Sequence, residues 1–267
     1  MSARRRTHTD TGWLTVLAPF CLGAVLLAGW AATAAVGTVP RNLLPSPGAV
    51  ARELWEGLVV YADMWGYIGV TLTEALSGCG VGFLVALPLA IVIYRCRIVS
   101  AAVLPFLGAT QAIPAIALAN LLILWIGYGL GSIVALCALM VFFPILVSSV
   151  VGFRHIDRDI LAAAQVDGAG TVSLLVFIEI PLALHNILAG VRNGFTLSVT
   201  GAVVGEMVMG GTGLGTLLTV QRDSYTTAGM FASIIVLAVM ATAIYSLVAL
   251  AERRWTNFAI QPTGGKK

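Results

Sequence analysis

Long apolar runs alternate with short polar breaks along most of this chain. A helix needs about 20 apolar residues to cross the hydrocarbon core of a bilayer, and six runs reach this length. They cover residues 13–36, 69–94, 99–126, 131–153, 182–209 and 229–251. The pattern predicts an all-α membrane protein with six transmembrane helices. Glycines within the runs, such as Gly78, Gly80 and Gly82, indicate helices that pack closely in a bundle.

The overall composition agrees with a lipid environment. Hydrophobic residues make up 59% of the chain and charged residues 10%, with a mean hydropathy of +0.97, whereas soluble domains carry about 25% charged residues. The net charge of +3 is too small to indicate nucleic-acid binding. Residues 13–36 exceed the core of a signal peptide and show no evident cleavage site, so we expect them to remain as the first transmembrane helix.

Lysine and arginine residues are distributed unequally between the connecting segments. With the N-terminus in the cytoplasm, eleven fall on the cytoplasmic side and three, Arg41, Arg52 and Arg222, on the outer side. Because cytoplasmic loops carry an excess of these residues, both termini are expected in the cytoplasm. The predicted organisation is a cytoplasmic tail, a first transmembrane helix, an outer segment, a core domain of about five membrane helices and a cytoplasmic C-terminal tail, at residues 1–12, 13–36, 37–66, 67–252 and 253–267.

The outer segment contains a short amphipathic pattern. Pro47 suits the first turn of a helix and Ser46 suits its N-cap. Val50, Leu54 and Leu58 would share one face. Two interpretations stand, a helix along the outer membrane interface and a surface helix without a packing partner.

Residues 154–181 interrupt the apolar pattern on the side assigned to the cytoplasm. Asp157 or Asp159 can cap a helix that runs to Val166, and Gly168 can end it in a left-handed turn.

A second helix is predicted after this turn. It can begin at Thr171 or Ser173, and Pro181 would close it and redirect the chain into the next span. The first helix contains three consecutive alanines, whose small side chains let another backbone approach closely. The resulting helix-turn-helix bracket can serve as a docking element for a partner protein, or it can pack against its own membrane domain.

The spacing within this bracket resembles a known pattern. Membrane subunits of binding-protein-dependent ABC importers carry E-A-A-x-x-x-G, then nine residues and I-x-L-P. This chain has the same spacing, with the corresponding positions at Ala162, Ala163, Ala164, Gly168, Ile178, Ile180 and Pro181. It departs from the pattern where Ala162 replaces Glu and Ile180 replaces Leu. The resemblance implies that residues 154–181 form the ATPase-coupling loop.

Five further fragments resemble the branch of this family that serves nitrate, sulfonate and taurine. They read LPSP, ALPLAIVI, AIPAIALANLLILWIGYG, FFPIL and GTGLG, at residues 44–47, 86–93, 112–129, 142–146 and 211–215. The resemblance implies the type I ABC importer permease fold in a bacterial inner membrane. It also implies a second permease copy, two cytoplasmic ATPase subunits that bind ATP and Mg²⁺, and an extracytoplasmic solute-binding protein. Pyrimidine vitamin precursors remain open as substrates beside sulfonates, taurine and nitrate.

Polar residues within the spans are candidates for the transport pathway. Glu74 is expected to be solvated at the outer interface, and Glu206 to line an outer vestibule or meet the binding protein. Arg192 is either a snorkelling arginine or a pathway residue that would favour an anion. The uncharged candidates, each with interhelical hydrogen bonding as the alternative, are Gln111, Asn120, Asn193, Ser198 and Thr200.

Other classes of protein fit the sequence less well. The chain has no G-x-x-x-x-G-K-[ST] motif, so ATP is expected on partner subunits, with no cofactor or metal on this chain. A stand-alone ion-coupled carrier or channel, the main alternative, would show duplicated halves and paired midplane carboxylates. An enzyme would need a catalytic set, yet His8, His155 and His185 all fall in or near cytoplasmic segments. The sequence therefore predicts a non-enzymatic permease subunit that works by alternating access.

Overall fold

The computed structural model describes residues 12–37, 39–40, 42–110 and 112–260. Every regular element within these ranges is helical, which confirms the all-α prediction for this part of the chain. The elements are α1 (Gly12–Val36), α2 (Pro47–Trp55), η1 (Glu56–Val60), α3 (Met64–Arg95), α4 (Arg97–Thr110), α5 (Ala115–Ile126), α6 (Leu130–Arg154), α7 (Arg158–Val166), α8 (Thr171–Leu174), η2 (Leu175–Glu179), α9 (Ile180–Met209), α10 (Leu214–Asp223) and α11 (Thr227–Ile260).

Five helical segments in the described residues are long and apolar enough to cross a membrane. They are Leu17–Val36, Met64–Arg95, Leu130–Arg154, Thr171–Met209 and Thr227–Glu252. The predicted span at residues 99–126 instead divides into α4 and α5. Pro114 has extended backbone angles (φ −62°, ψ 132°) at the start of α5, and a proline disfavours helix in the residue before it. Six transmembrane helices and cytoplasmic termini remain predictions.

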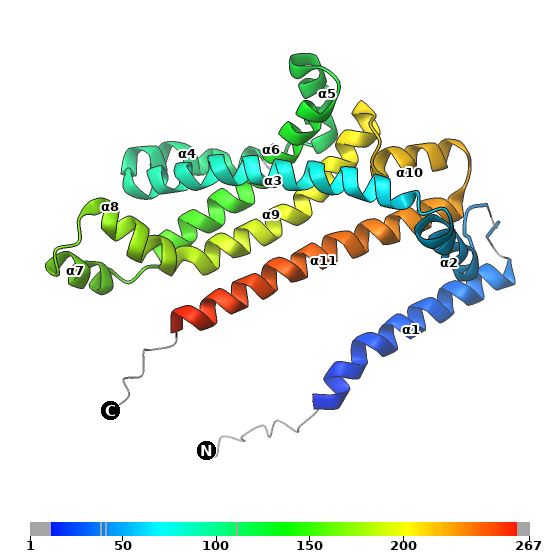
Figure 1. Ribbon diagram of the computed structural model, residues 1–267, viewed down its shortest axis with the longest axis horizontal. Coiled ribbons are helices and arrows are strands. Elements are labelled where there is room, and N and C mark those ends of the chain that lie inside the picture. Colours follow the sequence, from blue (N-terminus) through cyan, green and yellow to red (C-terminus); the bar gives the residue numbers. More distant parts are fainter. Residues whose placement is uncertain (1–11, 38, 41, 111, 261–267) are drawn as a thin grey trace, which may run out of the picture.

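Helices α3, α6 and α9 form the centre of the bundle, with α6 packed against both others (Figure 1). A Cβ atom at Gly78 of α3 would lie 2.1 Å from the Cβ of Cys137 in α6. One at Gly190 of α9 would lie 2.8 Å from the Cβ of Ser148 in α6. The bundling interpretation is thus confirmed for Gly78 but wrong for Gly80, which faces open space.

Replacing Gly78 with alanine should therefore destabilise the bundle, while Gly80→Ala is a control two residues away in the same helix. The added methyl group at position 78 cannot fit between α3 and α6 unless the helices separate, an overpacking cost of about 1–3 kcal/mol. Gly80→Ala should leave stability unchanged or raise it, because alanine favours helix. Melting temperatures of the purified variants in detergent test this, and equal values would contradict the close packing.

Helix α2 of the outer segment begins where the sequence predicts, and its apolar face packs against the core. Ser46 is its N-cap and accepts a hydrogen bond from the backbone N–H of Ala49 at 3.2 Å. Val50 is buried, and Leu54 and Leu58 pack against the core. Since α2 contacts α11, the interpretation without a packing partner is wrong.

Helix α1 stands apart from the bundle along most of its length (Figure 1). Near its end, the indole N–H of Trp30 donates to the carbonyl oxygen of Pro45 at 3.0 Å, and the indole stacks on Phe231. Apolar side chains nearer its start, such as Phe20 and Val25, are exposed. The helix therefore presents an apolar surface suited to lipid or to another membrane helix.

Candidate coupling and transport site

The predicted bracket is present at one end of the molecule, where α7 and α8 meet (Figure 1). Asp157 is the N-cap of α7, and its Oδ1 accepts a hydrogen bond from the N–H of Asp159 at 2.9 Å. Gly168 has a φ of +89°, the left-handed conformation that favours glycine. The N–H of Ala169 donates back to the carbonyl oxygen of Ala164 at 3.0 Å, which closes the turn. The cap and turn predictions are confirmed.

The exit from the bracket differs from the prediction, because Pro181 does not redirect the chain. Helices α8, η2 and α9 form one continuous helical segment from Thr171 to Met209. The π-helical turn η2 precedes the proline, and the N–H of Ile180 bonds to the carbonyl oxygen of Leu175. This wider turn changes the hydrogen-bond pattern where a proline would break a regular helix. The bracket is therefore joined to α9 by continuous helix.

The first helix of the bracket is open to solvent. Ala162 and Ala163 are exposed, Ala164 is half-buried and Val166 is 87% exposed. In Figure 1, α7 extends beyond the ends of α6 and α9. An exposed small-residue helix with an apolar tip has the form of a docking element.

The base of the bracket contains a buried ion pair that the sequence analysis did not identify. Glu179, only 1% exposed, bonds through Oε2 to Nη2 of Arg95 at 2.5 Å. The hydroxyl of Tyr94 donates to its Oε1 at 3.3 Å. A single acidic residue in the apolar sequence LLVFIEIP was a signal for a buried partner, but local sequence does not identify which cation.

A second buried carboxylate lies at the opposite end of α9. Glu206 accepts hydrogen bonds from the hydroxyl of Thr71 at 2.7 Å and from the N–H of Gly215 at 2.5 Å. The hydroxyl oxygen of Thr71 in turn accepts from the N–H of Leu214 at 2.8 Å. Glu206 and Thr71 thus accept hydrogen bonds from backbone N–H groups in the first turn of α10. The N-terminus of a helix also favours a negative charge.

Glu206 and Glu74 are both buried, unlike the sequence prediction. Glu206 is 1% exposed and faces the junction of α3, α9 and α10, where it lines no open vestibule. Glu74 is 4% exposed, so the expectation that water solvates it is wrong. It lies one turn beyond Thr71 on α3 and has an oxygen atom without a partner in the described residues.

Arg192 is paired with an acidic residue of α11. Its Nη1 lies 3.2 Å from Oε2 of Glu252 in α11, and its guanidinium lies over the ring of Tyr245 at 5.0 Å. The other carboxylate oxygen of Glu252 lies 2.8 Å from Nδ1 of His185. Glu252 therefore supplies a negative charge beside both Arg192 and His185.

The uncharged pathway candidates separate into a buried and an exposed group. Ser198 is buried and donates to the carbonyl oxygen of Ala75 at 2.7 Å, as an interhelical hydrogen bond. Asn120, Asn193 and Thr200 are exposed. Gln111 lies outside the described residues.

Among the exposed candidates, Asn193 lies at a pocket and Asn120 bonds within its own helix. Asn193 borders a pocket of about 510 Å³ with Thr196, Leu197 and residues of α11. Asn120 donates only to the carbonyl oxygen of Ile116 in its own helix, at 3.1 Å.

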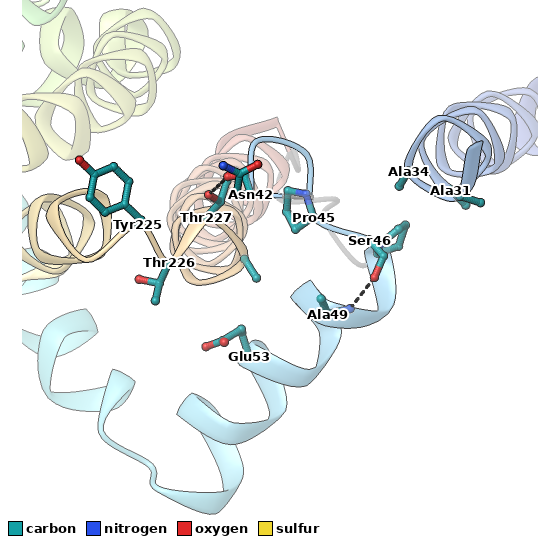
Figure 2. A pocket seen from close by; sticks show the side chains of 13 residues that line it. Ala31, Ala34, Asn42, Pro45, Ser46, Ala49, Glu53, Tyr225, Thr226 and Thr227 are labelled. Carbon is teal, nitrogen blue, oxygen red and sulfur yellow. Dashed lines mark hydrogen bonds between the residues drawn. The ribbon is translucent and has the colours of Figure 1, made fainter. Parts of the chain in front are cut away.

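A larger pocket of about 630 Å³ lies at the end of the molecule opposite the bracket (Figures 1 and 2). Its walls come from α1, from α2 with the segment before it, and from the turn that precedes α11. Figure 2 shows Glu53 of α2 on one side and Thr226 and Thr227 on the other. Among the described residues of the lining, Glu53 is the one carboxylate. No local sequence pattern indicates this pocket, because its lining residues are far apart along the chain.

The fold and the exposed bracket define an all-helical membrane protein with a docking element at one end. The chain belongs to the family of binding-protein-dependent transport system inner membrane components, whose sequence model matches residues 78–257. It is therefore a permease subunit of an ABC importer, as the resemblance implied, and an integral membrane protein.

Curated relatives cover nearly the whole chain. The riboflavin transport system permease protein RibX of Chloroflexus aurantiacus is 38% identical over 258 residues, 96% of each chain. The putative aliphatic sulfonates transport permease protein SsuC of Escherichia coli is 28% identical over 246 residues, 92% of this chain and 93% of that protein. The taurine transport system permease protein TauC of Escherichia coli is 26% identical over 238 residues, 87% of this chain and 86% of that protein.

Solved structures show the same fold. An inward-facing form of the MetNI methionine ABC transporter has a TM-score of 0.63 at 18% identity, covering 79% of this chain and 98% of that chain. An amino acid ABC transporter with histidines has a TM-score of 0.58 at 21% identity, covering 75% and 98%. The type I ABC importer permease fold is thereby confirmed.

Proposed function

We propose that the chain forms the translocation pathway of the importer together with a second permease copy. Two cytoplasmic ATPase subunits would each bind one bracket, and an extracytoplasmic binding protein would deliver the solute. The observation that carries this proposal is the bracket itself, because its alanine helix is exposed while its exit helix is continuous with α9. Closure of the ATPase dimer would then move packed helices between two states, giving alternating access.

The orientation of the chain follows from the same assignment. In Figure 1 the start of α1, the end of α11 and the bracket lie toward the same side of the molecule. The excess of Lys and Arg in the sequence segments assigned to the cytoplasm supports a cytoplasmic position for both termini. We therefore place the protein in the bacterial inner membrane with α4 and α5 together completing six crossings.

The exposed polar face of α9 is our candidate for the pathway wall. Asn193, Thr196 and Thr200 lie at helical spacing on this face and are exposed. Polar residues of membrane helices generally face a cavity or a protein partner. Ser198 and Glu206 point into the subunit and are assigned structural roles instead.

The proposed substrate is a small solute of the kinds that the relatives' names give, riboflavin, aliphatic sulfonates or taurine. Because Arg192 is paired with Glu252, the support for an anionic solute comes from the names of the sulfonate and taurine relatives. Riboflavin, named for the relative at 38% identity, is the first solute to test.

Co-purification and vesicle uptake test the proposed function. The tagged chain should bring an ABC ATPase with it from membranes. The complex, in vesicles with its binding protein, should take up one of these solutes only when ATP is supplied to the ATPase side. Uptake that needs an ion gradient and no ATPase would instead identify a stand-alone carrier and overturn the proposal.

A further inference from the structure

The ion pair between Arg95 and Glu179 joins the exit from the bracket to the end of α3, across 84 residues of sequence. Glu179 is the last residue of the π-helical turn η2, and Arg95 is the last residue of α3. The glutamate side chain is 1% exposed and that of the arginine 35% exposed. A buried carboxylate cannot exchange its partner for water, so moving Glu179 away from Arg95 is energetically unfavourable.

The entrance to the bracket is attached at the same place. Tyr94, which also donates to Glu179, stacks on Phe153 at the end of α6, with ring centroids 5.4 Å apart. The guanidinium of Arg95 lies 5.6 Å from the Tyr94 ring centroid. Both ends of the bracket are therefore held by two neighbouring residues at one end of α3.

The opposite end of α3 is also fixed. Thr71 binds both Glu206 of α9 and the N–H of Leu214 in α10. Helix α3 thus connects the base of the bracket to the helices at the other end of the molecule.

From this geometry we infer that Arg95 and Glu179 are positioning residues that transmit movement of the bracket to α3. The inference rests on the proposed function and adds a route for the coupling. When an ATPase subunit displaces the bracket, the ion pair would make α3 move with it as a rigid body. Without the ion pair, the bracket would move while α3 stayed behind, so ATP would be hydrolysed without solute crossing.

The test uses the assembled transporter with its binding protein and measures solute transported per ATP hydrolysed. Glu179→Gln and Arg95→Gln should both keep the ATPase bound but lower this ratio at least about fivefold, the lower range of allosteric coupling. Reversing the pair, Arg95→Glu with Glu179→Arg, should restore part of the ratio. Asp223→Asn, which breaks an exposed ion pair with Arg222 elsewhere, is the control and should leave the ratio unchanged.

The outcomes separate this inference from the proposed function. If the unsubstituted chain binds no ATPase, the proposed function fails. If it transports normally and both single variants keep the normal ratio, only the role of the ion pair is overturned. Should Glu179→Gln fail to fold, Arg95→Gln decides the question, because Tyr94 still donates to the glutamate.

Discussion

Replacing Glu206 with alanine is expected to destabilise the protein by about 3 kcal/mol or more, since it leaves buried hydrogen-bond donors unsatisfied. The carboxylate accepts from the hydroxyl of Thr71 and from the N–H of Gly215, and it is almost completely buried. The change also removes a negative charge from the N-terminus of α10, where it is favourable. The measurement is the melting temperature of the purified protein in detergent.

Glu53→Ala is the matched control for this variant. Glu53 is a half-buried glutamate of α2 and lines the pocket at the end of the molecule opposite the bracket. Substitutions at such sites usually change stability by no more than about 0.5 kcal/mol. If both alanine variants melted at the temperature of the unsubstituted protein, Glu206 would not anchor α10.

The same cluster explains two of the three glycines of the GTGLG fragment. A Cβ atom at Gly213 would lie 2.0 Å from Oε1 of Glu206, and one at Gly215 would lie 2.4 Å from the carbonyl oxygen of Val203. In the sequence this fragment indicates only a family resemblance. Its physical role is to let the start of α10 approach a buried carboxylate on α9.

Local features of this chain could be predicted because their causes are local. Ser46 and Asp157 cap helices, and Gly168 adopts the left-handed conformation, as their types and positions indicate. Even the error at Pro181 has a local origin, since the rule that proline ends a helix does not anticipate a preceding π-helical turn.

Pairing across the bundle could not be predicted in this way. Thr71 and Glu206 are 135 residues apart, and no periodicity within α3 or α9 specifies their contact. The sequence places Glu74 and Glu206 toward the outer side, because each lies near the end of an apolar run. Their burial follows from how α3, α9 and α10 converge, which is a property of the tertiary structure.

Replacing Gly168 with valine is expected to lower ATP-driven uptake by about tenfold or more, without changing the melting temperature of the membrane helices. Gly168 has a φ of +89° with no atoms near its Cβ position, so the effect comes from backbone strain and not from a clash. Such strain costs about 1–3 kcal/mol, and a β-branched residue is especially unfavourable there. Relief of the strain would turn α7 away from the direction set by α8. Uptake into vesicles and the amount of co-purified ATPase measure the result.

Two variants show whether strain within the bracket is the cause. Gly168→Asn should keep most of the uptake, because asparagine tolerates the left-handed conformation. Gly37→Val places the same residue type at another glycine of positive φ (+71°) with open space around it, but outside the bracket. It should therefore leave the amount of co-purified ATPase unchanged. Normal uptake and normal ATPase binding by Gly168→Val would show that the geometry of this turn does not control coupling, and the assignment of the bracket would have to be abandoned.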